Sequence, residues 1–243
     1  MPADVRMWIE VAFNVTYLIV VWGLVAMMWQ RRATIAAGDR PIAGRFMAAF
    51  ALLALGDTGH VGFRVLAYAL GGLDARPVIL GQPVSLVGLG ALATAYTVTL
   101  FYVLMLDIWR LRNGKRFGAF AYFLLALAAA RLVLMAFPQN EWWRMDPIPP
   151  WNLIRNAPLT VMGLGIAYLI LRDARRTQDR VFTWIGGLIV VSYSCYVPVI
   201  LFAAQAPLVG MLMIPKTLAY LGVASVAFRA FYPGRARVLV VTA

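Results

Sequence analysis

Seven apolar runs dominate this chain, and each is long enough to cross a lipid bilayer as a helix. A helix rises about 1.5 Å per residue, so about 20 residues span a hydrocarbon core of about 30 Å. We predict membrane-spanning helices at residues 7–30, 43–70, 84–109, 116–137, 151–172, 181–203 and 208–231. Proline, glycine or charged residues separate the runs. The chain is therefore expected to be an all-α, polytopic membrane protein that forms a seven-helix bundle.

The composition supports a lipid environment and a single domain. Of the 243 residues, 63% are hydrophobic and 13% are charged, which leaves too few polar side chains to cover a water-soluble globule. No change in composition and no Gly/Ser linker divides the chain, so residues 1–243 are expected to form one domain. The first run has no small-residue cleavage pattern before Arg31 and Arg32, and it should remain as a membrane helix.

The basic residues follow a topology, although a net charge of +12 first suggests a nucleic-acid partner. Fifteen of the 22 Lys and Arg residues fall on one side of the predicted spans: Arg31, Arg32, Arg40, Arg45, Arg110, Arg112, Lys115, Arg116, Arg172, Arg175, Arg176, Arg180, Arg229, Arg235 and Arg237. Positive residues resist translocation, so this side should be cytoplasmic. We expect the N-terminus outside, the C-terminus in the cytoplasm, a location in the cytoplasmic (cell) membrane, and no nucleic acid bound.

Charged residues inside the spans are the most informative, because each costs about 2.5–3.5 kcal/mol at a helix centre. The second span carries Asp57, His60 and Arg64 at positions i, i+3 and i+7, which helical periodicity places on one face. The other embedded charges are Arg131, Arg155 and Lys216. Lys216 lies about eight residues, or about 12 Å, from the predicted outer end of its span, and the two arginines also fall in the outer half.

Glycines and a proline mark where helices should approach or bend. Gly56, Gly59 and Gly62 reduce the bulk beside the Asp57 face and would let a neighbouring helix or a ligand come close. Pro215, next to Lys216, is expected to free a backbone carbonyl and kink the last helix.

These embedded residues, together with polar residues of the outer loop at 137–142, predict a net cationic cavity in the outer half. The candidate ligand-binding residues are Asp57, His60, Arg64, Arg131, Gln139, Asn140, Glu141, Arg155, Asn156 and Lys216. The cations would attract an anionic small molecule or lipid headgroup, while Asn156 and Gln139 orient it and Asp57 and Glu141 partly neutralise the charge.

A purely structural interpretation competes with this prediction. Arg131 and Arg155 are near enough to the interface to extend their charges into it, and Asp57 could form a structural bridge with His60, Arg64 or Lys216. Tyrosines such as Tyr196 are expected to be core packing. With one histidine and one cysteine, Cys195, the sequence offers no multi-histidine metal site and no internal disulfide, and we expect neither metal nor cofactor.

Four motifs together resemble a group of uncharacterised bacterial seven-helix membrane proteins. They are G-D-x-x-H-x-x-x-R from Gly56, F-P-Q-N-x-W from Phe137, R-N-x-P from Arg155 and M-I-P-K-T from Met213. The resemblance implies the fold and no activity. A looser similarity to microbial rhodopsins would make Lys216 the lysine that forms a Schiff base with retinal, but Leu212 stands where that family carries an acid.

The leading hypothesis is thus a membrane receptor or carrier that binds an anion in its outer half. An intramembrane enzyme is the main alternative, with Asp57 and His60 exchanging protons while the cations stabilise negative charge. A retinal-binding protein is the third hypothesis. No nucleophile–histidine–acid order and no phosphate-binding loop indicates a specific reaction.

Overall fold

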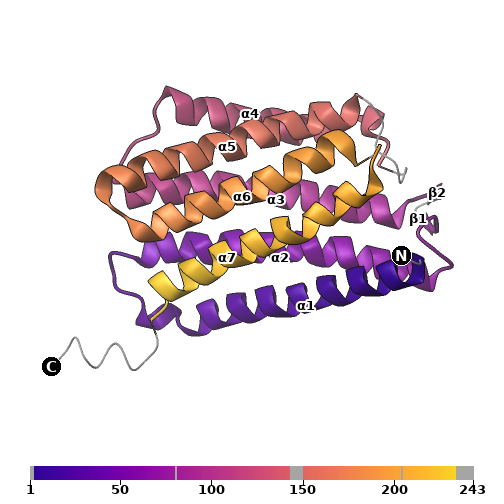
Figure 1. Cartoon of the computed structure of the whole chain (residues 1–243), viewed down its shortest axis with the longest axis horizontal. Coiled ribbons are helices and arrows are strands. Elements are labelled where there is room, and N and C mark those ends of the chain that lie inside the picture. Colours follow the sequence, from indigo (N-terminus) through magenta and orange to yellow (C-terminus); the bar gives the residue numbers. More distant parts are fainter. Residues whose placement is uncertain (1–2, 80, 143–149, 204, 234–243) are drawn as a thin grey trace.

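The computed structural model describes residues 3–79, 81–142, 150–203 and 205–233, without the side chains of 3–10, 82 and 207. Seven long helices make up this part of the chain (Figure 1): α1 (Ala3–Gln30), α2 (Arg40–Ala69), α3 (Leu86–Arg112), α4 (Ala119–Ala136), α5 (Trp151–Thr177), α6 (Arg180–Phe202) and α7 (Met213–Phe231). All seven spans are long and apolar enough to cross a membrane. The predicted all-helical bundle is confirmed, and its seven long apolar helices are those expected of a multi-pass membrane protein.

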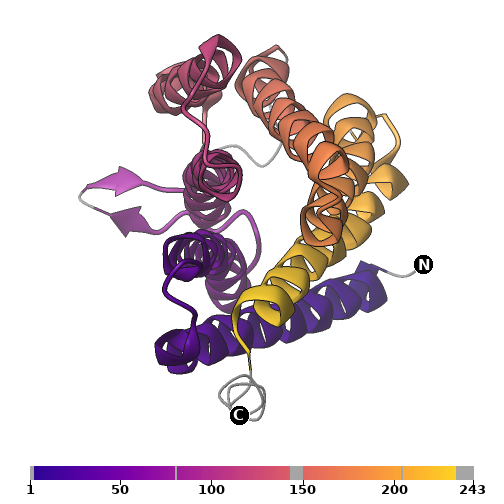
Figure 2. The same ribbon diagram turned by 90° about the vertical axis from the view of Figure 1, so that its left-hand side faces the viewer.

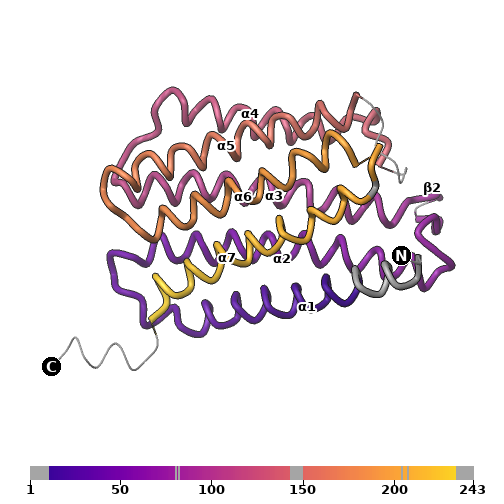
Figure 3. The backbone as a smooth tube through the Cα atoms, viewed as in Figure 1, coloured from indigo at the N-terminus to yellow at the C-terminus, as the bar shows by residue number. Residues whose placement is uncertain are grey.

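Consecutive helices pack side by side, and α1 also packs against α7, which closes the bundle (Figure 2). Between α2 and α3, the short strands β1 (Val78–Ile79) and β2 (Gln82–Pro83) pair antiparallel. We call the end of the bundle with this pair the hairpin end. The opposite end, where α1 and α7 finish, is the basic end, and the backbone trace in Figure 3 shows the two ends clearly. Arg235 and Arg237 lie outside the described residues.

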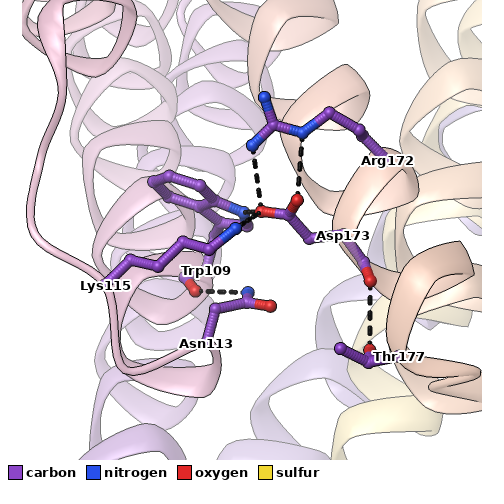
Figure 4. Close-up of polar contacts among 6 residues, drawn as sticks. All are labelled: Trp109, Asn113, Lys115, Arg172, Asp173 and Thr177. Atoms are coloured by element: carbon purple, nitrogen blue, oxygen red, sulfur yellow. Dashed lines mark hydrogen bonds and ion pairs between the residues drawn. The ribbon is translucent and has the colours of Figure 1, made fainter.

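Asp173 of α5 organises a polar network at the basic end (Figure 4). Its side chain is 2% exposed and accepts hydrogen bonds from Trp109 Nε1 at 3.0 Å, Lys115 Nζ at 2.6 Å and Arg172 Nε at 2.9 Å. Trp109 belongs to α3, and Lys115 follows α3 in the loop to α4. One buried carboxylate therefore joins α5 to α3 and to the loop that follows it.

Two further aspartates pair with arginines at the same end. Asp107 of α3 pairs with Arg45 of α2 and with Arg110, whose Nη2 lies 2.6 Å from Asp107 Oδ1. Arg112 pairs with Asp179, the N-cap residue of α6, at 2.8 Å. Asp107 thus joins α2 to α3, and Asp179 joins α3 to the start of α6. Ion pairs as well as packing therefore stabilise the basic end.

An aromatic core fills the bundle between the basic end and its middle. Phe101 packs edge-on against Tyr102 and Tyr220 with ring centroids 5.2 and 5.5 Å apart, and the two tyrosine hydroxyls lie 2.8 Å from each other. Phe46 is fully buried in the same cluster. Tyr232, just after α7, donates to a backbone oxygen of α2 at 2.6 Å. Burial raises the pKa of Tyr232 to about 12, so its hydroxyl remains a donor at neutral pH.

Glycines bring α2 and α3 into close contact. A Cβ on Gly56 would clash with the side chain of Thr97 and come within 3.2 Å of Thr94 Cα, and one on Gly59 would lie 3.3 Å from Ala93 Cβ. Among the described residues, no atom lies within 4 Å of the corresponding position on Gly62. The predicted close approach is therefore confirmed at Gly56 and Gly59, where α3 is the neighbour, and is not seen at Gly62.

Replacing Gly56 by alanine should lower the free energy of unfolding by about 1–2 kcal/mol, because the new methyl group forces α2 and α3 apart. Gly62→Ala is the matched control, since it adds the same methyl group on the same helix into open space. Thermal unfolding of the two variants in mild detergent measures the difference. Equal stability of the two variants would contradict the packing argument.

The last predicted span is divided into two elements. A 3-10 segment, η3 (Pro207–Leu212), precedes α7, which begins at Met213. Pro215 consequently lies in the first turn of α7, where a backbone N–H has no intrahelical partner to lose. The last predicted span is thus interrupted near Pro215, but the interruption lies at the junction of η3 and α7, just before the proline.

Candidate functional site

A cavity of about 540 Å³ lies in the hairpin half of the bundle, above the aromatic core. Its volume is within the usual range for small-molecule sites. All seven helices contribute lining residues. Seven of the ten predicted site residues line it: Asp57, His60, Arg64, Arg131, Arg155, Asn156 and Lys216. Embedded charges from four different helices, α2, α4, α5 and α7, are thus brought to one cavity.

The α2 wall contains the three residues predicted to share a helix face. Asp57, His60 and Arg64 all line the cavity. Asp57 Oδ2 accepts a hydrogen bond from the Tyr17 hydroxyl of α1 at 2.9 Å, its one hydrogen-bond partner in the described part of the chain. His60 Nδ1 is buried and has no hydrogen-bond partner among the described residues. The structure does not show Asp57 in a bridge with His60, Arg64 or Lys216; a tyrosine holds it instead.

Arg131 of α4 is the most buried cation of the site, with 2% of the residue exposed. Its Nε donates to the backbone oxygen of Arg155 at 2.8 Å, and its Nη1 donates to the Ala95 oxygen at 3.0 Å and to the Thr99 hydroxyl. All of these acceptors are uncharged. Arg131 therefore points into the bundle, and the interpretation that it extends towards the membrane interface is wrong.

Arg155 and Lys216 present their charges beside aromatic rings. The Arg155 guanidinium lies 4.4 Å from the centre of a Trp142 ring, and Lys216 Nζ lies 4.3 Å from the centre of the Tyr196 ring. Lys216 is also 5.8 Å from the Tyr220 ring centre. Aromatic faces stabilise cations through their quadrupoles without neutralising them. These two side chains thus keep their positive charge available to the cavity.

The charge balance of the lining is clearly positive. Its charged side chains are four cations and, among the described lining residues, one carboxylate, Asp57. An uncompensated cation in a low-dielectric interior is costly, and an anion at the site would relieve that cost. The lining is otherwise largely apolar, which strengthens electrostatic attraction by excluding water.

Asn156 is buried at the α5 side of the cavity and is oriented on both sides of its amide. The Tyr196 hydroxyl donates to Asn156 Oδ1 at 3.0 Å, and Asn156 Nδ2 donates to the Asn152 backbone oxygen at 2.9 Å. Asn156 and Tyr196 thus form one rigid polar unit. Tyr196 packs against the core, as predicted, and it also lines the cavity.

The three outer-loop residues of the prediction do not line the cavity. Asn140 is buried and donates to the Leu134 and Phe137 backbone oxygens, so it caps the end of α4. Gln139 is exposed, and Glu141 adopts a left-handed backbone with φ of 41°. The residue of this loop that reaches the cavity is Trp142, whose Nε1 donates to the Met135 oxygen at 3.0 Å.

Sequence reasoning did not assign the aromatic lining residues to the site: Phe13, Tyr17, Trp142, Tyr196 and Tyr220. For Tyr220 a signal was available, because it follows Lys216 by one helical turn. Within the described residues, no group of three His, Cys, Asp or Glu side chains is arranged to hold a metal ion. Comparison with protein-family models, curated proteins and solved structures found no match to this chain. What the site binds must therefore be inferred from its own charges and contacts.

Proposed function

We propose that this protein is a membrane receptor or carrier that binds an anionic small molecule or lipid headgroup in the hairpin-end cavity. Arg64, Arg131, Arg155 and Lys216 supply charge and hydrogen bonds, and Asn156 orients the ligand through its amide. A carboxylate or phosphate accepts such charge-assisted hydrogen bonds well, and the arginine fork fits both.

The proposed topology places the hairpin end outside the cell membrane and the basic end in the cytoplasm. The support is the concentration of lysine and arginine at the basic end, since positive residues are retained on the cytoplasmic side. The cavity then lies in the outer half of the membrane. A ligand reaches it from the extracytoplasmic solution or from the outer leaflet.

The observation that carries the proposal is the environment of Arg131. This arginine is buried, lines the cavity and donates only to uncharged oxygens among the described residues. Removing the carboxylate from a buried ion pair usually costs about 3–5 kcal/mol, because the remaining charge is left uncompensated. A buried arginine that has no carboxylate partner is therefore normally compensated by another anion. An anionic ligand in the cavity would provide that compensation.

The direct test is binding of simple anions to the purified protein in a non-ionic detergent. Inorganic phosphate and acetate are titrated while heat release and thermal unfolding are recorded. Two results support the proposal. The added anion raises the unfolding temperature of the wild type, and it is displaced by the anion that native mass spectrometry finds co-purifying with the protein. Absence of binding for both probes and of any co-purifying anion contradicts it.

Asp57→Asn should strengthen phosphate binding about tenfold. The substitution removes the carboxylate that repels an anion, and such repulsion across a partly buried site is worth about 1–2 kcal/mol. Asparagine can still accept the Tyr17 hydrogen bond, so the fold should persist. Asp39→Asn at the basic end is the control, with unchanged affinity expected. A weaker affinity in Asp57→Asn would show that Asp57 assists the ligand instead of opposing it.

An intramembrane enzyme is the second candidate, and the observation that favours it is the free nitrogen of His60. Nδ1 is buried without a described partner on a wall that also carries Asp57. A bound ligand could exchange a proton with this imidazole. Turnover that disappears in both Asp57→Asn and His60→Ala while ligand binding persists would favour the enzyme over the receptor or carrier.

A further inference from the structure

The cavity lining reaches the exposed surface of the bundle at the junction of η3 and α7. Among the described lining residues, Met211 and Met213 are the two that are also exposed, at 37% and 38%. The other described lining residues are buried or half-buried. Met211 and Met213 stand at the junction of η3 and α7, so this junction is the mouth of the cavity.

The mouth lies at membrane depth and not in a loop. Its other side is formed by Phe13 and Asn14 of α1. Phe13 and Asn14 belong to the candidate span Val11–Gln30, and both methionines belong to the candidate span Leu208–Phe231. Met211 and Met213 lie three and five residues inside their span, about 5–8 Å at helical rise. The mouth therefore faces the outermost hydrocarbon, just below the headgroups.

The paths of α1 and α7 explain why a gap exists here. Near the middle of the bundle, Leu221 of α7 packs against the Tyr17 and Val21 cluster of α1. From there towards the hairpin end the two ribbons diverge (Figure 1). The cavity lining continues between them, from Phe13 and Asn14 on one side to the methionines on the other.

The chemistry changes from the mouth to the interior. Phe13, Met211, Met213 and Ile214 make the rim mostly apolar, whereas Arg131 and its neighbouring cations lie within. Methionine is flexible and polarizable, and it suits a surface that accommodates hydrocarbon chains of variable shape. An apolar rim that faces lipid admits an amphiphile already resident in the membrane more readily than it admits a small hydrophilic anion.

We infer that the ligand is an anionic amphiphile: its head group lies against Arg131, Arg155 and Lys216, and its hydrocarbon tail leaves between α1 and the η3–α7 junction into the outer leaflet. This inference rests on the proposed function and names the ligand class and entry route for the same cavity. The bilayer is as apolar as the mouth, so a longer tail adds little affinity for a ligand drawn from the membrane. The position of the tail is therefore the decisive measurement.

The test uses dodecyl phosphate carrying a photoreactive diazirine in the middle of its chain. The full chain is reconstituted in nanodiscs of zwitterionic lipid, irradiated and mapped by peptide mass spectrometry. We expect saturable labelling of peptides that contain Phe13 or Met211 to Met213, displaced by unlabelled dodecyl phosphate. Labelling confined to the outer-loop peptide containing Trp142, or spread without saturation over lipid-facing residues, would overturn the inference.

A variant pair tests the mouth itself. Met213→Trp should obstruct the gap and reduce saturable labelling about tenfold or more. Leu208→Trp is the matched control, because Leu208 is 79% exposed on the adjoining 3-10 segment η3 and does not line the cavity. Equal labelling in the two variants would overturn the route. Equal thermal stability of the two variants excludes misfolding as the cause of a difference.

Inorganic phosphate separates failure of this inference from failure of the proposed function. If phosphate binds and dodecyl phosphate neither displaces it nor labels the mouth, the cavity binds anions from water and the amphiphile is wrong. If neither phosphate nor dodecyl phosphate binds the wild type, the proposed function fails with it. If the mouth is labelled in the wild type and Arg131→Met abolishes this labelling, the result supports both the proposed function and the amphiphilic ligand.

Discussion

Replacing Arg131 by methionine is expected to weaken phosphate binding by a factor of about 200 to 5,000. The substitution removes the most buried cation of the cavity, and loss of one partner from a buried charge pair typically costs about 3–5 kcal/mol. In the absence of ligand, the variant should lose little free energy of unfolding. Methionine fills a similar volume, and the Thr99 hydroxyl keeps its hydrogen bond to the Ala95 oxygen. Calorimetric titration measures the affinity, and thermal unfolding measures the stability.

Two companion variants make this prediction specific. Arg116→Met deletes the same side chain from an exposed position at the basic end, and it should leave phosphate affinity unchanged. Arg131→Lys keeps the charge and loses the planar fork, so it should retain an intermediate affinity. Wild-type affinity in a folded Arg131→Met protein would mean that the anion, if bound, lies elsewhere.

The seven helices were predictable because length and hydropathy together determine what can cross a bilayer. Helix ends were less predictable, and α5 shows why. Its predicted end at residue 172 reflects the polar sequence from Asp173 onwards, yet α5 continues to Thr177. Asp173 is buried there by its partners from α3 and the following loop. A hydropathy pattern treats a charge as solvent-exposed and does not show that another helix neutralises it.

The site was predictable where a single helix determines the geometry. Asp57, His60 and Arg64 share a face by helical spacing alone, and all three line the cavity. The convergence of Arg131 and Lys216 depends on how α4 and α7 pack, which spacing along the chain does not determine. Loop residues lack periodicity, and so the prediction included Asn140, which caps α4, and omitted Trp142, which reaches the cavity.

The two ends of the bundle use charge differently. At the basic end, aspartates pair with the cations, as Asp173 does with Lys115 and Arg172. In the cavity, Arg131 donates to uncharged oxygens, and Arg155 and Lys216 lie beside aromatic rings. We therefore expect the basic end to stabilise the fold and the cavity to bind the ligand. Mutations at the basic end should change stability, and mutations in the cavity should change binding.

Asp173→Ala should therefore lower stability and leave binding intact. It deprives Trp109 Nε1 of its acceptor and separates Lys115 and Arg172 from their buried carboxylate. The Lys115 and Arg172 side chains are 41% and 32% exposed, so water partly solvates them. We therefore expect the free energy of unfolding to fall by about 2–3 kcal/mol, which is less than the cost of breaking a fully buried ion pair.

The matched control for Asp173→Ala is Asp39→Ala, because Asp39 at the start of α2 makes no side-chain capping bond. A change within about 0.5 kcal/mol is expected for Asp39→Ala. Chemical unfolding in detergent measures both variants, and titration of the folded protein with phosphate should give wild-type affinity in each. If Asp173→Ala weakened phosphate binding as strongly as Arg131→Met, the two ends would be coupled and the separation of roles would be wrong. If instead it lost stability alone, the cavity charges would act independently of the network that holds the helices together.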